Sequence, residues 1–172
     1  HSEFALLLNE QGERFCDESL GDHVNTGAVL AQSNARALCF WDSRIHQAYA
    51  CTPVVKGAEV LDKMAVALEH GGRGKVVADW TGLESFANAQ GFAGRKVIET
   101  LLQYNDACRR GWETLCPRRA ENFGVQDQPP FYALVVLPAI THTHAGIRVD
   151  ATARVLRPDG SAVPGLLAAG VD

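Results

Sequence analysis

Two histidines, His142 and His144, stand on either side of Thr143 between two apolar runs in the last part of the sequence. Residues two apart on a strand point to the same side of it, so the two imidazoles could jointly bind a divalent metal. The other histidines and carboxylates follow no recognisable metal-ligand spacing. A strand end that binds a substrate beside a redox cofactor is the competing interpretation. A purely structural pair, with one histidine hydrogen-bonded and the other solvated, is a third.

A second group of titratable residues lies near the start of the chain: Asp17, Glu18, Asp22 and His23. Carboxylates and an imidazole this close in sequence could transfer protons, although carboxylates before a helix also act as caps or stay solvated. In the segment just before them, Gly12 is typical of a turn with positive φ. We interpret Glu13 and Arg14 as a solvated pair and Phe15 as a core anchor.

The segment GLLAAG, residues 165–170, is short, apolar and bounded by glycines. Small residues at the end of a strand allow the backbone to approach a ligand closely, and a plain buried strand is equally compatible. The chain contains neither GxGxxG nor GxxxxGK[ST]. It therefore brings no phosphate-binding glycine loop of its own.

Hydrophobic periodicity and turn signals predict the elements that must position these residues. Strands are expected at 5–9, 35–43, 75–80 and 131–140, and a hairpin over 146–170 around the turn sequence RPDG. Helices are expected at 25–34, 57–72, 81–92 and 93–111, and a polar loop at 112–130. Because helices and strands do not alternate strictly, the fold class is predicted to be α+β.

Side-chain spacing also predicts where these helices begin and which faces they bury. Asn25 or Thr26 is expected to cap the first helix, and Thr81 the third, with Glu84 at the capping-box position. The helix over 93–111 is the clearest, with a predicted buried face of Val97, Leu101, Tyr104 and Cys108. The helix over 57–72 has a predicted apolar face of Val60, Met64, Ala67 and Leu68.

The composition is that of an ordinary globular chain of 172 residues, with 47% hydrophobic and 21% charged residues. This length suits one core, or one domain and part of another. A net charge of −4 gives no indication of a nucleic-acid or anionic-membrane partner. No apolar run approaches the roughly 20 residues of a membrane span.

The 5 cysteines form no CxxC pair, which predicts reduced thiols in a cytoplasmic protein.

Four segments occur in a characteristic order: LLLNEQGERFCDE, LESFANAQGF, VIETLLQYNDACRRG and PPFYALVVLPAITHTHAGIRVDATARVLRPDGSAVPGLLAAG. Together they resemble the second half of the fumarate reductase and succinate dehydrogenase flavoprotein family. Its wider membership includes tricarballylate and ketosteroid dehydrogenases. No single segment is decisive, but the resemblance covers nearly the whole chain in the correct order.

The resemblance implies two domains. Residues 1–136 would form the capping domain that closes over the substrate, and residues 137–172 would be a partial segment of the FAD-binding domain. The glycine-rich dinucleotide-binding half would lie before residue 1, so the chain is expected to be a fragment. Such a fragment is expected to bind FAD weakly or not at all and to be inactive. It would expose apolar surface along 137–172, through which it could dimerise.

The resemblance also implies roles for individual residues. His142 and Thr143 would bind a carboxylate or similar group of the substrate while hydride passes to or from flavin N5. The cofactor would be approached by Ala145, Gly146, Gly165, Ala169 and Gly170. Asp22 stands where fumarate reductases carry a proton-donating arginine, so proton transfer is assigned to Asp22, to His23 or to a group outside the fragment.

Other departures from the family pattern narrow the expected activity. Ala145 replaces the first glycine of a pair, and Val171 replaces a glutamate. We therefore expect a parent protein that is an FAD-dependent dehydrogenase or reductase of a small organic acid or a steroid-like substrate. The alternatives are a metal-dependent hydrolase using His142 and His144, and a non-catalytic interaction domain.

Overall fold

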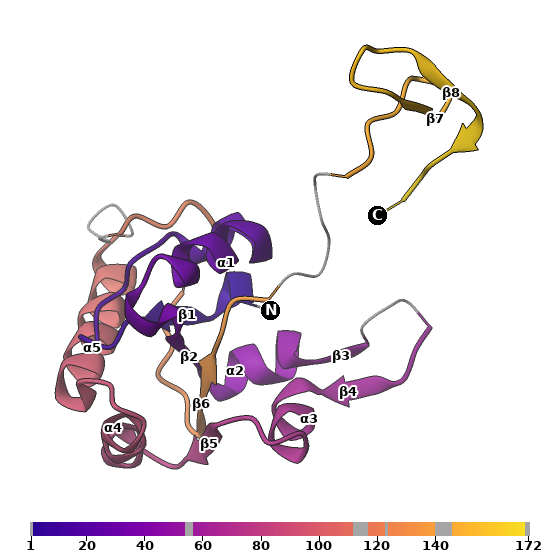
Figure 1. The fold of residues 1–172 in the computed structure, drawn as a ribbon. Coiled ribbons are helices and arrows are strands. Elements are labelled where there is room, and N and C mark those ends of the chain that lie inside the picture. The colour runs from indigo at the N-terminus through magenta and orange to yellow at the C-terminus, as the bar shows by residue number, and fades with distance from the viewer. Residues whose placement is uncertain (1, 54–56, 112–116, 123, 140–145, 171–172) are drawn as a thin grey trace. The chain divides into compact units, whose positions relative to one another are not determined.

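A computed structural model describes residues 2–53, 57–111, 117–122, 124–139 and 146–170 of the chain. The chain divides into two compact units, His1–Pro138 and Ala139–Asp172 (Figure 1). The division falls close to the boundary expected after residue 136, while the assignment of the units to named domains stays a prediction. The mixture of helices and sheet that the sequence predicts is confirmed.

The first unit is built around an antiparallel sheet of 4 strands in the order β1-β2-β6-β5. The strands are β1 (Leu6–Leu8), β2 (Ala37–Trp41), β5 (Gly74–Val77) and β6 (Phe131–Val136). β1, β2 and β6 lie within segments where the sequence predicts a strand, whereas β5 begins one residue before the predicted strand 75–80 and ends at Val77. The two central strands are distant in sequence and pair with Phe40 opposite Ala133.

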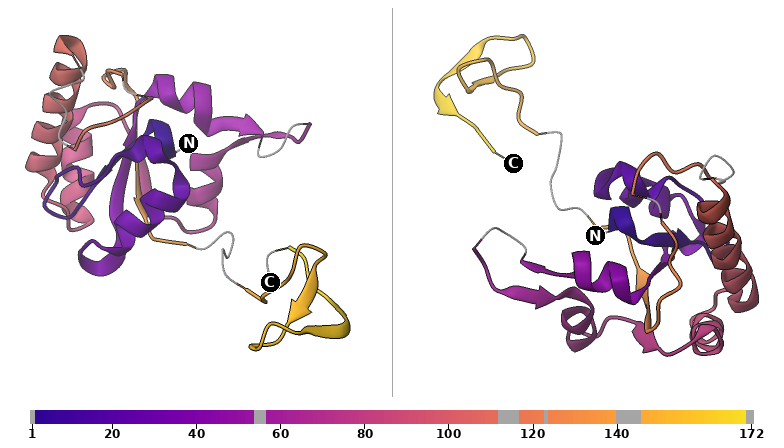
Figure 2. Two further views of the ribbon diagram at one scale, coloured as in Figure 1. Left: turned by 90° about the horizontal axis from the view of Figure 1, so that it is seen from above. Right: turned by 180° about the vertical axis from the view of Figure 1, so that it is seen from behind.

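Both faces of this sheet are covered, because neighbouring side chains of a strand point to opposite sides. Along β2, Phe40 joins the cluster beneath α4 (Trp80–Ala89) and α5 (Gly94–Arg110). Its neighbour Trp41 joins a second cluster with residues of α1 (Asp22–Leu30), α2 (Ser43–Ile45) and α3 (Lys63–Glu69). Figure 2 shows the two groups of helices on opposite sides of the sheet.

The longest helix, α5, has the predicted buried face. Val97, Leu101 and Tyr104 are at most 2% exposed, and Cys108 is partly buried against the same cluster. Gly12 approaches this helix closely, with φ +80°, and a Cβ there would lie 2.7 Å from the Val97 nitrogen. The turn glycine that the sequence predicts is therefore also a packing contact, and other residues would be both strained and obstructed.

Two predicted helix starts are wrong. The N-cap of α4 is Asp79, whose Oδ1 accepts a hydrogen bond from Gly82 N at 2.8 Å. Thr81 is an exposed residue of the first turn, because the preceding carboxylate already satisfies the free amide. Helix α1 begins at Asp22 after Gly21, which has φ +90°. Asn25, a predicted cap, is instead a buried helical residue.

The segment predicted as a helix over 57–72 is helical only in α3. Before it, β3 (Cys51–Pro53) and β4 (Val60–Asp62) form a hairpin. Val60 was expected in the apolar helix face but is 65% exposed on β4. The helix begins after Asp62 because its Oδ1 accepts hydrogen bonds from the first free amides, Met64 N and Ala65 N.

Short helical turns complete the first unit. They are the 3₁₀ turns η1 (Ser2–Phe4), η2 (Glu18–Leu20) and η3 (Ser33–Ala35), and the π-helical turn η4 (His46–Ala50). Among the described residues, no helix is both long and apolar enough to cross a membrane.

The second unit contains the predicted hairpin, formed by β7 (Arg154–Leu156) and β8 (Ala162–Leu167). Its turn is closed by a hydrogen bond from Gly160 N to Arg157 O at 2.9 Å, and Gly160 has φ +85°. Glycine adopts this backbone conformation without steric cost, as the RPDG signal requires.

Candidate functional site

A buried cluster of charged side chains lies directly before the predicted catalytic pair. The Glu18 carboxylate accepts hydrogen bonds from Arg14 Nε at 2.9 Å, from Arg14 Nη2 at 2.5 Å and from Leu7 N at 3.2 Å. Arg119 Nη1 lies 3.8 Å from the same carboxylate. The prediction that Arg14 belongs to a solvated pair is therefore wrong. Pairing of Arg14 with Leu8 across the turn directs its side chain inward, while Glu13 stays exposed.

The charge of the buried Arg14 side chain is stabilised by its pairing with Glu18. Burial alone would lower the pKa of the Arg14 guanidinium, but its hydrogen bonds to Glu18 outweigh burial and raise that pKa. Tyr104 lies beneath the guanidinium, with 5.3 Å from Arg14 Cζ to the ring centroid. Burial raises the pKa of Tyr104 to about 12. Tyr104 therefore stays neutral, and Glu18 balances the positive charge.

The cluster fixes the start of α1. Asn25 Nδ2 donates to the Glu18 carbonyl at 2.9 Å. Asp17 accepts from Ser19 N at 3.0 Å and from Ala120 N at 2.8 Å. Burial raises the pKa of Asp17, but these bonds and that of the Ser19 hydroxyl outweigh it and lower the pKa overall. The segment between β1 and α1 is thus linked to a distant part of the chain.

The predicted catalytic residues Asp22 and His23 occupy the first turn of α1, and both are exposed. The structure therefore presents them together at the end of a rigidly anchored segment. Their role in proton transfer stays a prediction.

The predicted substrate-binding and cofactor-binding residues belong to the second unit. His142, Thr143 and Ala145 lie outside the described residues, as does His144 of the metal-site alternative. Four of the five predicted cofactor residues are described and exposed: Gly146, Gly165, Ala169 and Gly170.

The glycines of the GLLAAG segment have unusual backbone conformations. Gly165 has φ +73° within β8, and Gly170 has φ +108° beyond it. A Cβ at either position would meet no atom within 4 Å, so open space rather than crowding surrounds them. The plain buried strand is wrong for this segment, since Leu166 and Leu167 are 49% and 65% exposed. Close approach to a ligand stays a prediction.

A small cavity in the first unit is lined by Phe4, Arg44, Tyr49 and Gln126, among others, and has a volume of about 110 Å³. Among the described residues, Gln126 Oε1 is buried without a hydrogen-bond partner. Pockets for cofactors and drug-sized ligands have volumes of roughly 300–1,000 Å³. This cavity is therefore too small for a flavin.

The first unit also contains a group of possible metal ligands that no sequence motif indicates. His46 Nε2 lies 3.2 Å from Cys51 Sγ and 3.3 Å from Asp62 Oδ2. The sequence carries no CxxC or other ligand spacing here, and the helix predicted over 57–72 would have separated Asp62 from Cys51. The signal that could have found the group is the register of a β3–β4 hairpin, in which Cys51 and Asp62 are directly opposed.

The family described as "FAD binding domain" matches residues 2–172 of this chain. Among curated relatives, fumarate reductase (cytochrome) of Shewanella frigidimarina is 28% identical over 170 residues, which cover 96% of this chain and 26% of the relative. The 3-oxosteroid 1-dehydrogenase of Mycobacterium tuberculosis (strain ATCC 25618 / H37Rv) is 25% identical, covering 96% of this chain and 32% of the relative. The chain thus spans about a quarter to a third of these relatives.

Solved structures show the same fold. The open conformation of a flavocytochrome c3 fumarate reductase has a TM-score of 0.62 at 24% identity, covering 97% of this chain and 27% of that one. A 3-ketosteroid delta1-dehydrogenase from Sterolibacterium denitrificans has a TM-score of 0.62 at 18% identity, covering 95% and 32%. A solution NMR structure of the fumarate reductase flavoprotein subunit from Lactobacillus plantarum has a TM-score of 0.53 at 18% identity. It covers 83% of this chain and 89% of that one.

Proposed function

The chain belongs to the FAD-binding flavoprotein family of fumarate reductases and their relatives, and we propose that it is the substrate-closing part of an FAD-dependent dehydrogenase or reductase. The observation that carries this proposal is the family match, which runs through both units from residue 2 to residue 172. The match favours the oxidoreductase over the metal-dependent hydrolase and the interaction domain. FAD, when bound, supplies the hydride chemistry.

The first unit is assigned to the capping domain, residues 1–136, and the second to the returning segment of the FAD-binding domain, residues 137–172. Support comes from how each unit buries apolar surface. The first unit covers both faces of its own sheet. The second exposes Ile147, Val149, Leu166 and Leu167, each by at least 40%. A larger FAD-binding domain would bury such residues, and the isolated chain would dimerise through them.

Exposed glycine backbone in the second unit is suited to contact with a flavin. Gly165 and Gly170 are exposed, adopt positive φ and have open space where a side chain would be. Such backbone can approach a flat ring system closely. We assign Gly146 and Ala169, which are also exposed, and Ala145 to the same cofactor surface. Since this surface alone contains no phosphate-binding loop, the 172-residue chain is proposed to bind FAD weakly and to be inactive.

The chain's own residues would bind, orient and protonate the substrate. His142 and Thr143 are assigned to bind a polar group of the substrate and to polarise it. Asp22 and His23, which the buried Arg14–Glu18 pair positions on α1, are assigned to proton transfer. The proposed substrate is a small organic acid or a steroid-like molecule. The names of the relatives support both classes, since they include fumarate reductase and 3-oxosteroid 1-dehydrogenase.

Composition and cysteine chemistry support a cytoplasmic location for the protein. Cys16, Cys39, Cys51 and Cys108 are free thiols. Reduced cysteines are usual in the cytosol.

The visible spectrum of the purified full-length parent protein tests the proposal. Flavin absorption bands at about 370 and 450 nm are expected. The substrate that bleaches these bands identifies the reaction. Replacing His142 with Ala should lower kcat/KM about 100-fold or more. The matched control His70→Ala, at an exposed histidine after α3, should leave it unchanged. A colourless parent protein that cannot be reconstituted with FAD would contradict the proposed activity. Stoichiometric binding of FAD by the 172-residue chain would contradict the proposal that this chain binds FAD weakly.

A further inference from the structure

Three potential metal ligands converge where η4 meets the β3–β4 hairpin. His46 Nε2 lies between the Cys51 sulfur, at 3.2 Å, and the Asp62 carboxylate, at 3.3 Å. The three ligand atoms all lie within 4.8 Å of one another. Imidazole, thiolate and carboxylate are all ligands that Zn²⁺ and related cations accept.

Two of these side chains, Asp62 and His46, are each positioned by a second interaction. Asp62 uses Oδ1 to cap α3, accepting from Met64 N at 2.9 Å, which leaves Oδ2 facing His46. The His46 ring stacks on Tyr132 with 3.8 Å between centroids and 7° between planes. Its Nδ1 accepts a hydrogen bond from Trp41 Nε1 at 3.3 Å. The cap and the ring stacking orient Asp62 and His46 before an ion arrives, whereas the hydrogen bond from Trp41 favours the metal-free state.

The local backbone also brings the ligands together. Cys51 and Asp62 face each other as Cα partners in the hairpin. His46 opens the π-helical turn η4, and π-helical turns occur frequently at functional sites. Lys63 Nζ donates to Tyr49 O at 2.9 Å and to Thr52 Oγ1 at 3.0 Å, which links the hairpin to the turn.

Two of the three ligand separations are close to those of tetrahedral coordination, and the third, between Cys51 Sγ and Asp62 Oδ2, is at most 4.8 Å. With zinc bonds of about 2.0 Å to nitrogen and oxygen and about 2.3 Å to sulfur, a tetrahedron places N and O about 3.3 Å apart and N and S about 3.5 Å apart. The observed values are 3.3 and 3.2 Å. The Asp62 side chain is 43% exposed, so a cation can enter and water can take the fourth position.

We propose that His46 Nε2, Cys51 Sγ and Asp62 Oδ2 form a binding site for a divalent transition-metal cation of the Zn²⁺ class. The site would crosslink the β3–β4 hairpin to η4. It is independent of the flavin chemistry proposed above, because its ligands belong to the first unit and serve none of the roles assigned there.

A cysteine nucleophile activated by the histidine does not fit the same geometry. Because Nδ1 accepts from Trp41, the neutral His46 ring carries its proton on Nε2 and cannot accept one from Cys51. A bound cation, in contrast, displaces the thiol proton to solvent by direct coordination.

Binding of the cation requires a tautomer exchange in His46. The ring proton moves from Nε2 to Nδ1, so the hydrogen bond from Trp41 is lost. At 3.3 Å this bond lies beyond the usual range for N–H donors. Removing the Trp41 donor should therefore strengthen metal binding.

Cobalt titration of the reduced, metal-free 172-residue chain tests the site. One Co²⁺ per chain is expected, with a thiolate-to-cobalt charge-transfer band that Zn²⁺ abolishes. Cys51→Ser should remove the band and weaken Co²⁺ binding at least 10-fold. Asp62→Asn should also weaken it about 10-fold while keeping an oxygen to cap α3. His142→Ala should change nothing, which separates this site from the histidines near the C-terminus.

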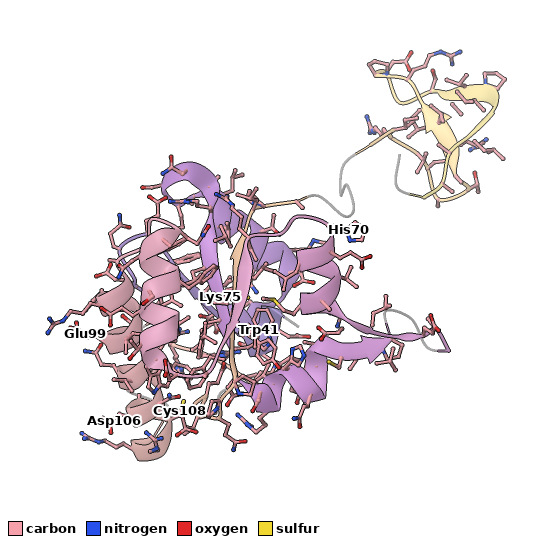
Figure 3. The ribbon with its side chains drawn as sticks, turned by 90° about the horizontal axis from the view of Figure 1, so that it is seen from below. Trp41, His70, Lys75, Glu99, Asp106 and Cys108 are labelled. Atoms are coloured by element: carbon pink, nitrogen blue, oxygen red, sulfur yellow. The ribbon has the colours of Figure 1, made fainter. Side chains whose placement is uncertain are left out.

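The matched control is Cys108→Ser. Cys108 is a partly buried thiol on α5, packed in the cluster on the other side of the sheet from Trp41 (Figure 3). Cys16 and Cys39 are buried, at 9% and 4% exposure, and neither belongs to the group of three potential ligands found among the described residues. Circular dichroism of each variant establishes that it is folded before it is titrated.

Absence of saturable Co²⁺ binding, or a charge-transfer band that persists in Cys51→Ser, would overturn the proposal. Trp41→Phe should bind Co²⁺ several-fold more tightly than the unchanged chain. Unchanged or weaker binding in a folded Trp41→Phe variant would overturn the tautomer exchange.

Discussion

The two units of this chain differ in how they are stabilised. The first has a sheet with an apolar cluster on each face, and side chains such as Leu38 and Phe40 are fully buried. In the second, Val155, at 9% exposure, is the one buried apolar side chain among residues 146–170. A two-stranded hairpin without a hydrophobic partner is at best marginally stable. The difference indicates that the first unit carries its own core, whereas the described residues of the second unit bury little apolar surface.

The largest expected effect comes from the buried charges of the first unit. Glu18→Gln should lower the free energy of unfolding by about 3–5 kcal/mol, because it leaves Arg14 and Arg119 buried without a compensating charge. Urea denaturation followed by tryptophan fluorescence measures the change. Glu13→Gln is the matched control, since Glu13 is exposed, and should change stability by less than about 0.5 kcal/mol. Equal losses of stability in Glu18→Gln and Glu13→Gln would contradict the prediction that the buried charge cluster stabilises the fold.

A pair of leucine truncations compares the units directly. Leu101→Ala in α5 should cost about 2–5 kcal/mol of unfolding free energy, because Leu101 is only 1% exposed. Leu167→Ala in β8 should change it by less than about 0.5 kcal/mol, because Leu167 is 65% exposed. Thermal and urea unfolding of both variants, at a concentration where the chain is monomeric, provide the measurement. If Leu167→Ala proved as costly as Leu101→Ala, the second unit would have a buried core of its own in solution.

A smaller effect is expected at the start of α4. Asp79→Ala should lower the free energy of unfolding by about 0.5–2 kcal/mol, because the Gly82 amide loses its acceptor. Thr81→Ala, at the cap position that the sequence suggests, should have less than half that effect. Amide hydrogen exchange at Gly82 reports the local change. A larger loss in Thr81→Ala would restore Thr81 as the cap.

The smallest expected effect is a pH dependence in the second unit. Hydrogen bonds from the Thr152 hydroxyl and amide and from Arg154 lower the pKa of Asp150 well below its ordinary value of 3.8. A lowered folded-state pKa means that this contribution is complete above about pH 4 and is lost as the pH falls through the folded-state value. Chemical shifts of the Thr152 and Arg154 amides should follow this titration. Asp150→Asn should abolish it, and a transition at or above pH 3.8 would contradict the assignment.

The local pattern of the sequence determined most of the elements. Short apolar runs were enough to place β1 and β6, and alternation with large apolar residues was enough to place β2. The face of α5 with Val97, Leu101 and Tyr104 followed from helical spacing in the same way. The order of family-like segments was enough to identify the flavoprotein family, since that signal depends on linear order.

The errors arose where nearby residues compete for the same local role. Asp79 and Thr81 both suit an N-cap, and only the position of the free amides decided for Asp79. The segment before α3 has helical spacing, but pairing with Cys51–Pro53 makes Val60–Asp62 a strand. Such pairing is a non-local contact, which no short window of sequence contains.

Only the tertiary structure decided the environment of the charged and ligand-forming side chains. Arg14 and Glu13 are adjacent and equally polar, yet one is buried beside Glu18 and the other is exposed. Likewise, His46, Cys51 and Asp62 carry no motif in sequence and converge through a hairpin and a π-helical turn. Residue type and spacing determine which local structure is favourable. Whether a charge is paired or a ligand meets another depends on long-range packing, which sets the distance between residues far apart in the chain.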